Sequence, residues 1–153
     1  MSTEKDNKAL IERWFRKVWN EGRAELIDEL RSAETVTTGL ADGKKPSHGQ
    51  EPFKRFYMNL REAFPDLHVT VHDVLAEGDK VAVRFTVEAT HSGPALGSPT
   101  KNKVHLDCMT LARIANGKIV ESWNSLDQLG ILKQIGALPA EYRMDFLISR
   151  STS

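Results

Sequence analysis

Residues 68–90 read HVTVHDVLAEGDKVAVRFTVEAT, and this stretch decides the fold. Polar and apolar side chains alternate from His68 to Glu77 and again from Lys80 to Thr90. A period of two is typical of β-strands. Gly78-Asp79 separates the two runs and is typical of a tight turn. The stretch therefore predicts an antiparallel hairpin.

The pattern continues toward the C-terminus with two more strands, Lys103–Ile114 and Lys118–Ser125. Asn116-Gly117 lies between them and is a strong hairpin signal. The segment Ser92–Asn102 is rich in glycine and proline and predicts a loop. Apolar residues at helical spacing between Leu126 and Leu138 predict a closing helix.

Toward the N-terminus the period changes to that of helices. Apolar stripes at helical spacing cover Leu10–Trp19, Leu26–Leu30 and Phe53–Phe64, with a brief strand expected at Glu34–Thr38. Helices first and long antiparallel strands afterwards predict an α+β fold. We expect a curved antiparallel sheet that wraps around the N-terminal helices and encloses a pocket.

Composition and charge narrow the function. With 153 residues, one domain over 1–153 is expected, with a loose tail from about Ser149. Lys+Arg and Asp+Glu both number 21, so the chain lacks the basic footprint of a nucleic-acid-binding protein. The polar N-terminus and the absence of a long apolar run predict a cytoplasmic protein without membrane contact. The single cysteine, Cys108, excludes an internal disulfide.

His91 is the first candidate for chemistry. It ends a row of alternate apolar residues that begins at Val81, and an imidazole is an unusual end for such a row. One interpretation is a histidine at the edge of the core, bonded to a backbone carbonyl. The other is a proton donor or acceptor inside a pocket.

Asp107 is the second candidate. It lies in an otherwise apolar strand and shares a side with His105, two residues away. If it faces a cavity, desolvation raises its pKa and suits it to proton transfer near neutral pH. The alternative is an aspartate paired with Arg84 or Arg113 on a wet face of the sheet.

Cofactors are not indicated. The sequence contains no phosphate-binding glycine loop and no nucleophile elbow. His91, His105 and Asp107 spell a loose two-histidine, one-carboxylate set, but this spacing is a weak metal signal, and we expect no metal. Cys108 is expected to be an inert small hydrophobe. Asp127 is expected to cap a helix.

Several segments, taken in order, resemble SnoaL-like polyketide cyclases over about residues 8–138. These segments are Val18-Trp19-Asn20-Glu21-Gly22, Phe64-Pro65-Asp66-Leu67, Glu77-Gly78-Asp79-Lys80-Val81, Thr90-His91-Ser92-Gly93, Pro99-Thr100, Arg113-Ile114-Ala115-Asn116-Gly117-Lys118-Ile119-Val120-Glu121, Trp123 and Gln134-Ile135-Gly136.

The resemblance implies the cone-shaped α+β barrel of the nuclear transport factor 2 superfamily, usually a dimer. In characterised cyclases of this family, a pocket aspartate and histidine promote intramolecular aldol closure without a cofactor. The matching residues here are Asp107 and His91. This chain departs from the family pattern at Ala89 and Lys101, where glycine is common, and at Asn124, where aspartate is frequent.

The leading hypothesis is therefore a cofactor-free cyclase acting on an apolar, carbonyl-bearing substrate as a homodimer. Asp107 would accept a proton, and His91, with His105 as a second donor, would hydrogen-bond the developing enolate oxygen. The residues expected to bind substrate are His105, Trp14, Tyr57, Phe64 and Trp123. The alternatives are an epoxide hydrolase or isomerase, and a non-catalytic binding protein. An Asp107 that is fully ion-paired and shielded from the cavity would favour binding alone.

Overall fold

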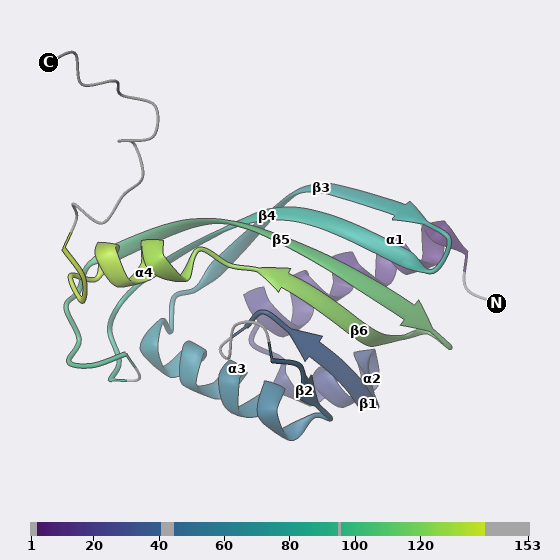
Figure 1. Ribbon diagram of the computed structural model, residues 1–153, viewed down its shortest axis with the longest axis horizontal. Coiled ribbons are helices and arrows are strands. Elements are labelled where there is room, and N and C mark those ends of the chain that lie inside the picture. Colours follow the sequence, from purple (N-terminus) through teal and green to yellow (C-terminus); the bar gives the residue numbers. More distant parts are fainter. Residues whose placement is uncertain (1–2, 41–44, 95, 140–153) are drawn as a thin grey trace, which may run out of the picture.

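The computed structural model describes residues 3–40, 45–94 and 96–139, and it shows a sheet arched over a group of helices (Figure 1). In chain order the elements are α1 (Glu4–Arg13), a π-helical segment (Trp14–Asn20), a 3-10 turn (Ala24–Leu26), α2 (Ile27–Leu30), β1 (Arg31–Thr38), β2 (Ser47–His48), α3 (Glu51–Ala63), β3 (His68–Glu77), β4 (Lys80–Thr90), β5 (Lys103–Ala115), β6 (Lys118–Ser125) and α4 (Gln128–Gln134).

The six strands form one sheet in the order β2-β1-β6-β5-β4-β3. The four long strands β3 to β6 form an antiparallel meander, as the sequence predicts. One pair departs from the expected antiparallel arrangement, because β1 pairs with β6 in parallel. A parallel pair needs a long connection. Here α3 and the first three meander strands lie between the two partners in the chain.

The turns of the meander follow the sequence signals. Asn116 and Gly117 have φ values of 53° and 72°, as a type I′ turn requires, and they join β5 to β6. Gly78 also has a positive φ, 60°, between β3 and β4. The expected hairpins are therefore confirmed.

The core lies between the helices and the inner face of the sheet. In β5, Val104, Leu106 and Cys108 are buried, whereas the residues between them face outward. Helix α1 begins at a capping box in which Thr3 and Asp6 bond each other's backbone N–H groups.

Side-chain bonds to the backbone position the helices. The hydroxyl of Tyr57 on α3 donates to the carbonyl of Val18 at 2.7 Å. The amide of Asn20 exchanges two hydrogen bonds with the backbone of Val69 on β3, at 2.7 and 2.8 Å. These bonds join the π-helical segment to α3 and to the edge strand β3, and so fix the helices relative to the sheet.

Several element boundaries differ from the expectation by a few residues. Strand β1 starts at Arg31, three residues before the expected Glu34, and the closing helix α4 ends at Gln134. The expected loose tail from about Ser149 lies outside the described residues. Within the described ranges, no helix is both long and apolar enough to cross a membrane.

Candidate functional site

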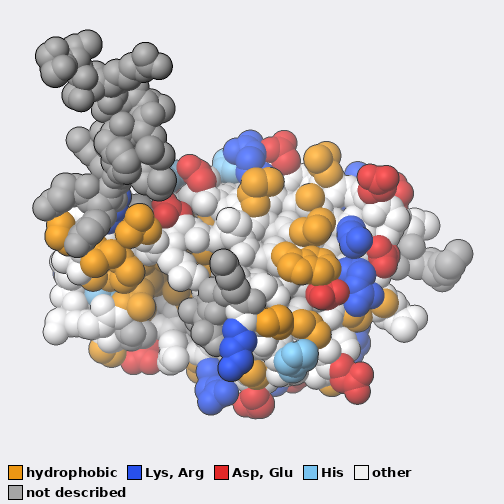
Figure 2. All heavy atoms as spheres, in the orientation of Figure 1, with side chains coloured by type: hydrophobic (Ala, Val, Ile, Leu, Met, Phe, Trp, Pro, Cys, Tyr) orange, Lys and Arg blue, Asp and Glu red, His pale blue; other side chains and the backbone are white. Residues whose placement is uncertain are grey.

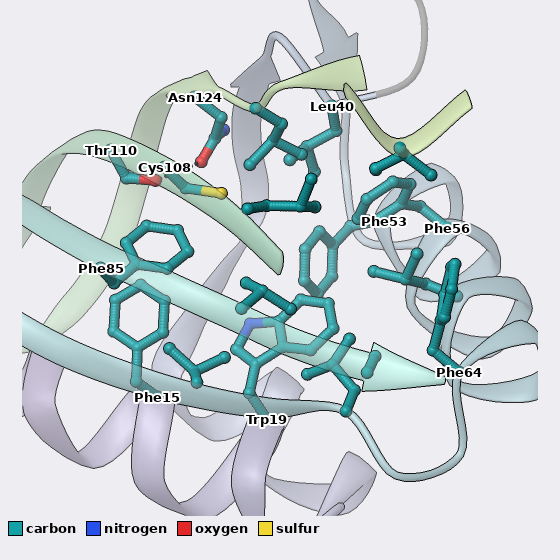
Figure 3. A pocket seen from close by; sticks show the side chains of 18 of the residues that line it. Phe15, Trp19, Leu40, Phe53, Phe56, Phe64, Phe85, Cys108, Thr110 and Asn124 are labelled. Atoms are coloured by element: carbon teal, nitrogen blue, oxygen red, sulfur yellow. Dashed lines mark hydrogen bonds between the residues drawn. The ribbon is translucent and has the colours of Figure 1, made fainter. Parts of the chain in front are cut away.

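A cavity of about 520 Å³ lies between the inner face of the sheet and the helices (Figure 3). Aromatic side chains form much of its wall: Phe53 and Phe56 project from α3, Phe85 from β4 and Trp19 from the π-helical segment. Volumes of about 300–1,000 Å³ are usual for small-molecule pockets. The cavity therefore has the size and the apolar lining of a ligand site.

Polar groups gather on one wall of this cavity, on β5 and β6. The hydroxyl of Thr110 donates to Oδ1 of Asn124 at 2.8 Å, and Figure 3 shows both beside Cys108. Nδ2 of Asn124 donates to the carbonyl of Thr38 at 3.0 Å and to Oγ of Ser122 at 3.2 Å. The amide of Asn124 is therefore held by bonds to β1, β5 and β6.

A glycine after β1 allows the backbone there to lie directly against β6 at this wall. Gly39 follows β1 with a φ of 90°, and a Cβ at this position would overlap the backbone carbonyl oxygen of Asn124. Only glycine combines this φ with so close an approach. Asn124 occupies a position where aspartate is frequent in the family that the sequence resembles. In the structure its amide lies on the cavity wall.

Arg31, at the start of β1, also lines the cavity and is only 2% exposed. Its guanidinium carbon lies 3.9 Å from the ring centre of Phe53 and 5.6 Å from that of Trp14. Nη2 donates to the hydroxyl of Thr37. Sequence reasoning missed this residue because it placed the strand start at Glu34. The available signal was a charged residue directly after the apolar helix that ends at Leu30.

Cys108 projects its sulfur toward the cavity (Figure 3) and is 2% exposed. Burial raises the pKa of its thiol to about 11. At neutral pH the side chain is therefore a neutral thiol. This agrees with the sequence-based expectation of an inert small hydrophobe.

His91 is buried, but it is not one of the described residues that line the cavity. Its ring packs 5.6 Å from that of Phe64, which does line it. The hydroxyl of Thr100 lies 3.1 Å from Nδ1 and its backbone N–H 3.4 Å away. Nε2 has no partner among the described residues. This position fits a histidine at the edge of the core, but among the described residues its ring contacts Thr100 and not the expected backbone carbonyl.

Asp107 and His105 lie on the outer face of the sheet, away from the cavity. The side chain of Asp107 is 83% exposed and that of His105 is 59% exposed. His105 lies 3.7 Å from Asp107 and 3.3 Å from Glu88. The expectation that Asp107 occupies a dry pocket is wrong. The physical reason is the register of β5, which turns Val104, Leu106 and Cys108 inward instead.

Of the other four residues expected to bind substrate, two line the cavity and two do not. Trp14 and Phe64 line the cavity. Tyr57 is buried in the helix packing, 4.9 Å from the ring of Trp19, and is not among the lining residues. Trp123 is 37% exposed on the outer face and does not reach the cavity. Asp127 accepts the N–H of Gly130 at 2.8 Å, which confirms it as the cap of α4.

The cavity's described lining has a restricted chemistry. Arg31 is its single charged residue, and neither a carboxylate nor a histidine belongs to it. Across the described ranges, no three or more histidine, cysteine, aspartate or glutamate side chains are grouped to hold a metal ion. The site offers apolar area, hydroxyl and amide groups, indole N–H groups and one buried cation.

Comparisons with known proteins show which family shares this architecture. The family model described as SnoaL-like polyketide cyclase matches residues 9–135. A comparison with curated proteins finds no match. Among solved structures, a proposed SnoaL-like polyketide cyclase from a Jannaschia species has 27% identity and a TM-score of 0.81, covering 91% of this chain and 97% of its own.

Two Streptomyces proteins are also similar. AclR of Streptomyces galilaeus, a proposed hydroxylase, is 30% identical with a TM-score of 0.79, over 90% of this chain and 100% of its own. IdmH of Streptomyces antibioticus, a proposed polyketide cyclase, is 28% identical with a TM-score of 0.75, over 85% and 98%. The family match and the fold agree, and this chain belongs to the SnoaL-like polyketide cyclase family.

Proposed function

We propose that this chain encloses an apolar, carbonyl-bearing, polyketide-like molecule in its cavity and promotes ring closure there without a cofactor. The observation that carries this proposal is the cavity itself, about 520 Å³ with aromatic walls and one grouped set of polar side chains. Such a combination of apolar area and a few convergent polar groups is typical of ligand sites. The family match supports the same class of substrate.

Confinement is the first contribution to catalysis. A flexible chain with several carbonyl groups has many conformations in water, and few of them bring the two reacting carbons together. Phe53, Phe85 and Trp19 restrict that freedom from three sides of the cavity. Holding reacting groups in line replaces a rare encounter with a frequent one.

Hydrogen-bond donors at the wall are the second contribution. Both N–H groups of Asn124 are engaged, so they hold the wall in place. The hydroxyl hydrogen of Ser122 and the indole N–H of Trp19 remain as donors at the cavity surface. Donors fixed around a developing enolate oxygen stabilise it more strongly than mobile water does.

The described cavity wall contributes no general base. Asp107, the sequence-based candidate, is on the outer face, and none of the described lining residues carries a carboxylate or an imidazole. In this proposal a water molecule takes the proton from the carbon between two carbonyl groups, and that carbon forms a bond to the carbon of another carbonyl group. The alkoxide that results takes a proton back from water. Epoxide hydrolysis is less well supported, because it requires a carboxylate that positions water at the cavity.

A second candidate function is binding without catalysis. The observation that favours it is the same lack of a carboxylate or histidine in the described lining. The two functions make the same prediction for binding and different predictions for turnover. One set of measurements therefore separates them.

The test combines a binding assay with a ring-closure assay. Quenching of tryptophan fluorescence by neutral 1,8-dihydroxyanthraquinone reports occupancy, because Trp14 and Trp19 line the cavity. Conversion of a linear triketone to its cyclic aromatic product, followed by absorbance, reports catalysis. Cys108→Phe adds a ring on the cavity side of β5, whereas Met109→Phe adds one on the outer side, where Met109 is 55% exposed.

We expect Cys108→Phe to weaken quenching at least about tenfold, the effect of about 1.4 kcal/mol, and to abolish ring closure. Met109→Phe and Asp107→Asn should match the unsubstituted protein in both assays. If the protein binds the quinone but does not cyclise the triketone, only the non-catalytic binding function is supported. Both functions are refuted if the protein does not bind the quinone, or if the Cys108→Phe variant binds it as tightly as the unsubstituted protein does.

A further inference from the structure

Arg31 is a buried cation whose role the proposed function does not use. It is the single charged residue among the described residues that line the cavity, and it is 2% exposed. Most lining side chains are aromatic or aliphatic. A guanidinium in such surroundings loses its hydration, which is costly unless a counter-charge compensates.

No described carboxylate forms an ion pair with Arg31. Burial alone lowers the pKa of its guanidinium, to about 9. Even with this shift the group is positively charged at neutral pH. The cavity therefore has a positive charge on its wall.

The hydrogen bonds of Arg31 are also incomplete. A guanidinium has five N–H donors. Nη2 donates to Thr37, and the buried Nε has no partner within the described part of the chain. The faces of Phe53 and Trp14 attract the cation, but they accept none of its in-plane N–H groups. The guanidinium therefore lies beside the cavity with its charge uncompensated and at least one N–H group unbonded.

We propose that Arg31 binds a carboxylate of the ligand, so that the cavity selects an apolar molecule that carries an acid group. This inference rests on the proposed function, because it takes the cavity as the ligand site. A carboxylate supplies the missing negative charge, and its two oxygens match the planar donor fork of arginine. The aromatic faces of Phe53 and Trp14 hold the guanidinium in place for that contact.

The test compares an acid with its neutral ester. 2-Naphthoate and methyl 2-naphthoate have the same apolar body and differ in charge at pH 7.5. Calorimetric titration should show that 2-naphthoate binds at least about tenfold more tightly than the ester. A cavity without an anion site gives the opposite order, because the carboxylate would lose its hydration without compensation.

Substitutions then assign the preference to Arg31. Arg31→Met keeps a long apolar side chain and removes the charge, so the order should reverse, with 2-naphthoate weakened at least about tenfold and the ester changed less than about threefold. Arg55→Met removes an exposed arginine of α3 and is the matched control, which should change neither affinity. Arg31→Lys keeps a charge without the fork, and should reduce the preference for the acid.

Each outcome has a distinct meaning. If the ester binds but 2-naphthoate binds no more tightly, the anion site is refuted and the apolar cavity stands. If neither compound binds, the proposed function fails with it. If Arg31→Met changes thermal stability but leaves the ratio of the two affinities unchanged, Arg31 serves only to join Trp14 and Phe53. If Arg31→Met does not fold, an unchanged ratio in Arg31→Lys refutes the proposal.

Discussion

At the scale of single residues, the thiol of Cys108 gives a direct measure of how closed the cavity is. Burial raises its pKa from 9.0 to about 11, so the reactive thiolate at pH 8 is about a hundredfold scarcer than for an ordinary thiol. We expect iodoacetamide to alkylate the folded protein at least about a hundredfold more slowly than the protein unfolded in guanidinium chloride. Mass spectrometry of timed samples measures both rates.

The raised pKa also predicts how the alkylation rate changes with pH. Because the folded pKa is raised, the protonated thiol persists as the pH rises, and the alkylation rate should still be increasing above pH 9. The unfolded protein supplies the control, since its rate should level off near the ordinary thiol pKa. Equal rates for folded and unfolded protein at pH 8 would show that the cavity is open to solvent.

Asp107 and Arg31 show which residue placements the sequence could not predict. Alternation correctly places His105, Asp107 and Met109 on one side of β5. It does not say which side faces inward, because both sides carry apolar residues, and a shift of one position exchanges the two faces. Arg31 lies beside an irregularity in the pairing of β1 with β6, which a simple alternation does not reveal.

At the scale of elements, local patterns predicted the helices and the meander well. The hairpins around Gly78 and Asn116-Gly117 depend on adjacent residues, and the structure confirms both. The parallel pairing of β1 with β6 joins segments about 90 residues apart, so no local pattern could predict it. Through this pairing Arg31 and Asn124 come to line one cavity.

The junction between α3 and the loop after β4 gives an element-scale prediction. The backbone N–H groups of Ser92 and Gly93 both donate to the carbonyl of Ala63, at 2.9 and 3.1 Å. A Cβ on Gly93 would overlap the carbonyl oxygen of Glu62. Gly93→Ala should therefore lower the free energy of unfolding by about 1–3 kcal/mol, measured by urea denaturation.

Ser92→Ala is the matched control for this junction. It leaves the backbone bond to Ala63 in place and adds no atom, so we expect a change within about 0.5 kcal/mol. A Gly93→Ala variant as stable as the Ser92→Ala variant would show that the loop can move away from α3.

At the scale of the whole molecule, the outer face of the sheet carries an apolar band across neighbouring strands. Leu75 is 70% exposed, Leu111 and Trp123 are each 37% exposed, and Met109 is 55% exposed. Leu111 lies between Ala82 and Trp123 in the strand pairing, and Leu75 is opposite Ala82. Figure 2 shows hydrophobic side chains gathered over these strands, with charged ones around them.

We predict that a second copy of this chain covers the band formed by Leu75, Met109, Leu111 and Trp123. Exposed apolar surface of this kind marks contact sites, and the chain's net charge of zero gives little repulsion between copies. Light scattering coupled to size exclusion should give twice the 17.2 kDa mass of the chain at tens of micromolar.

Leu111→Glu tests whether this band is the contact. A carboxylate there would lose its hydration on association, so we expect a monomer that keeps its fold by circular dichroism. Met58→Glu is the matched control, because Met58 is 61% exposed on α3 and lies outside the band. It should remain a dimer. A monomeric unsubstituted protein would refute the prediction, and a dimeric Leu111→Glu would place the contact elsewhere on the surface.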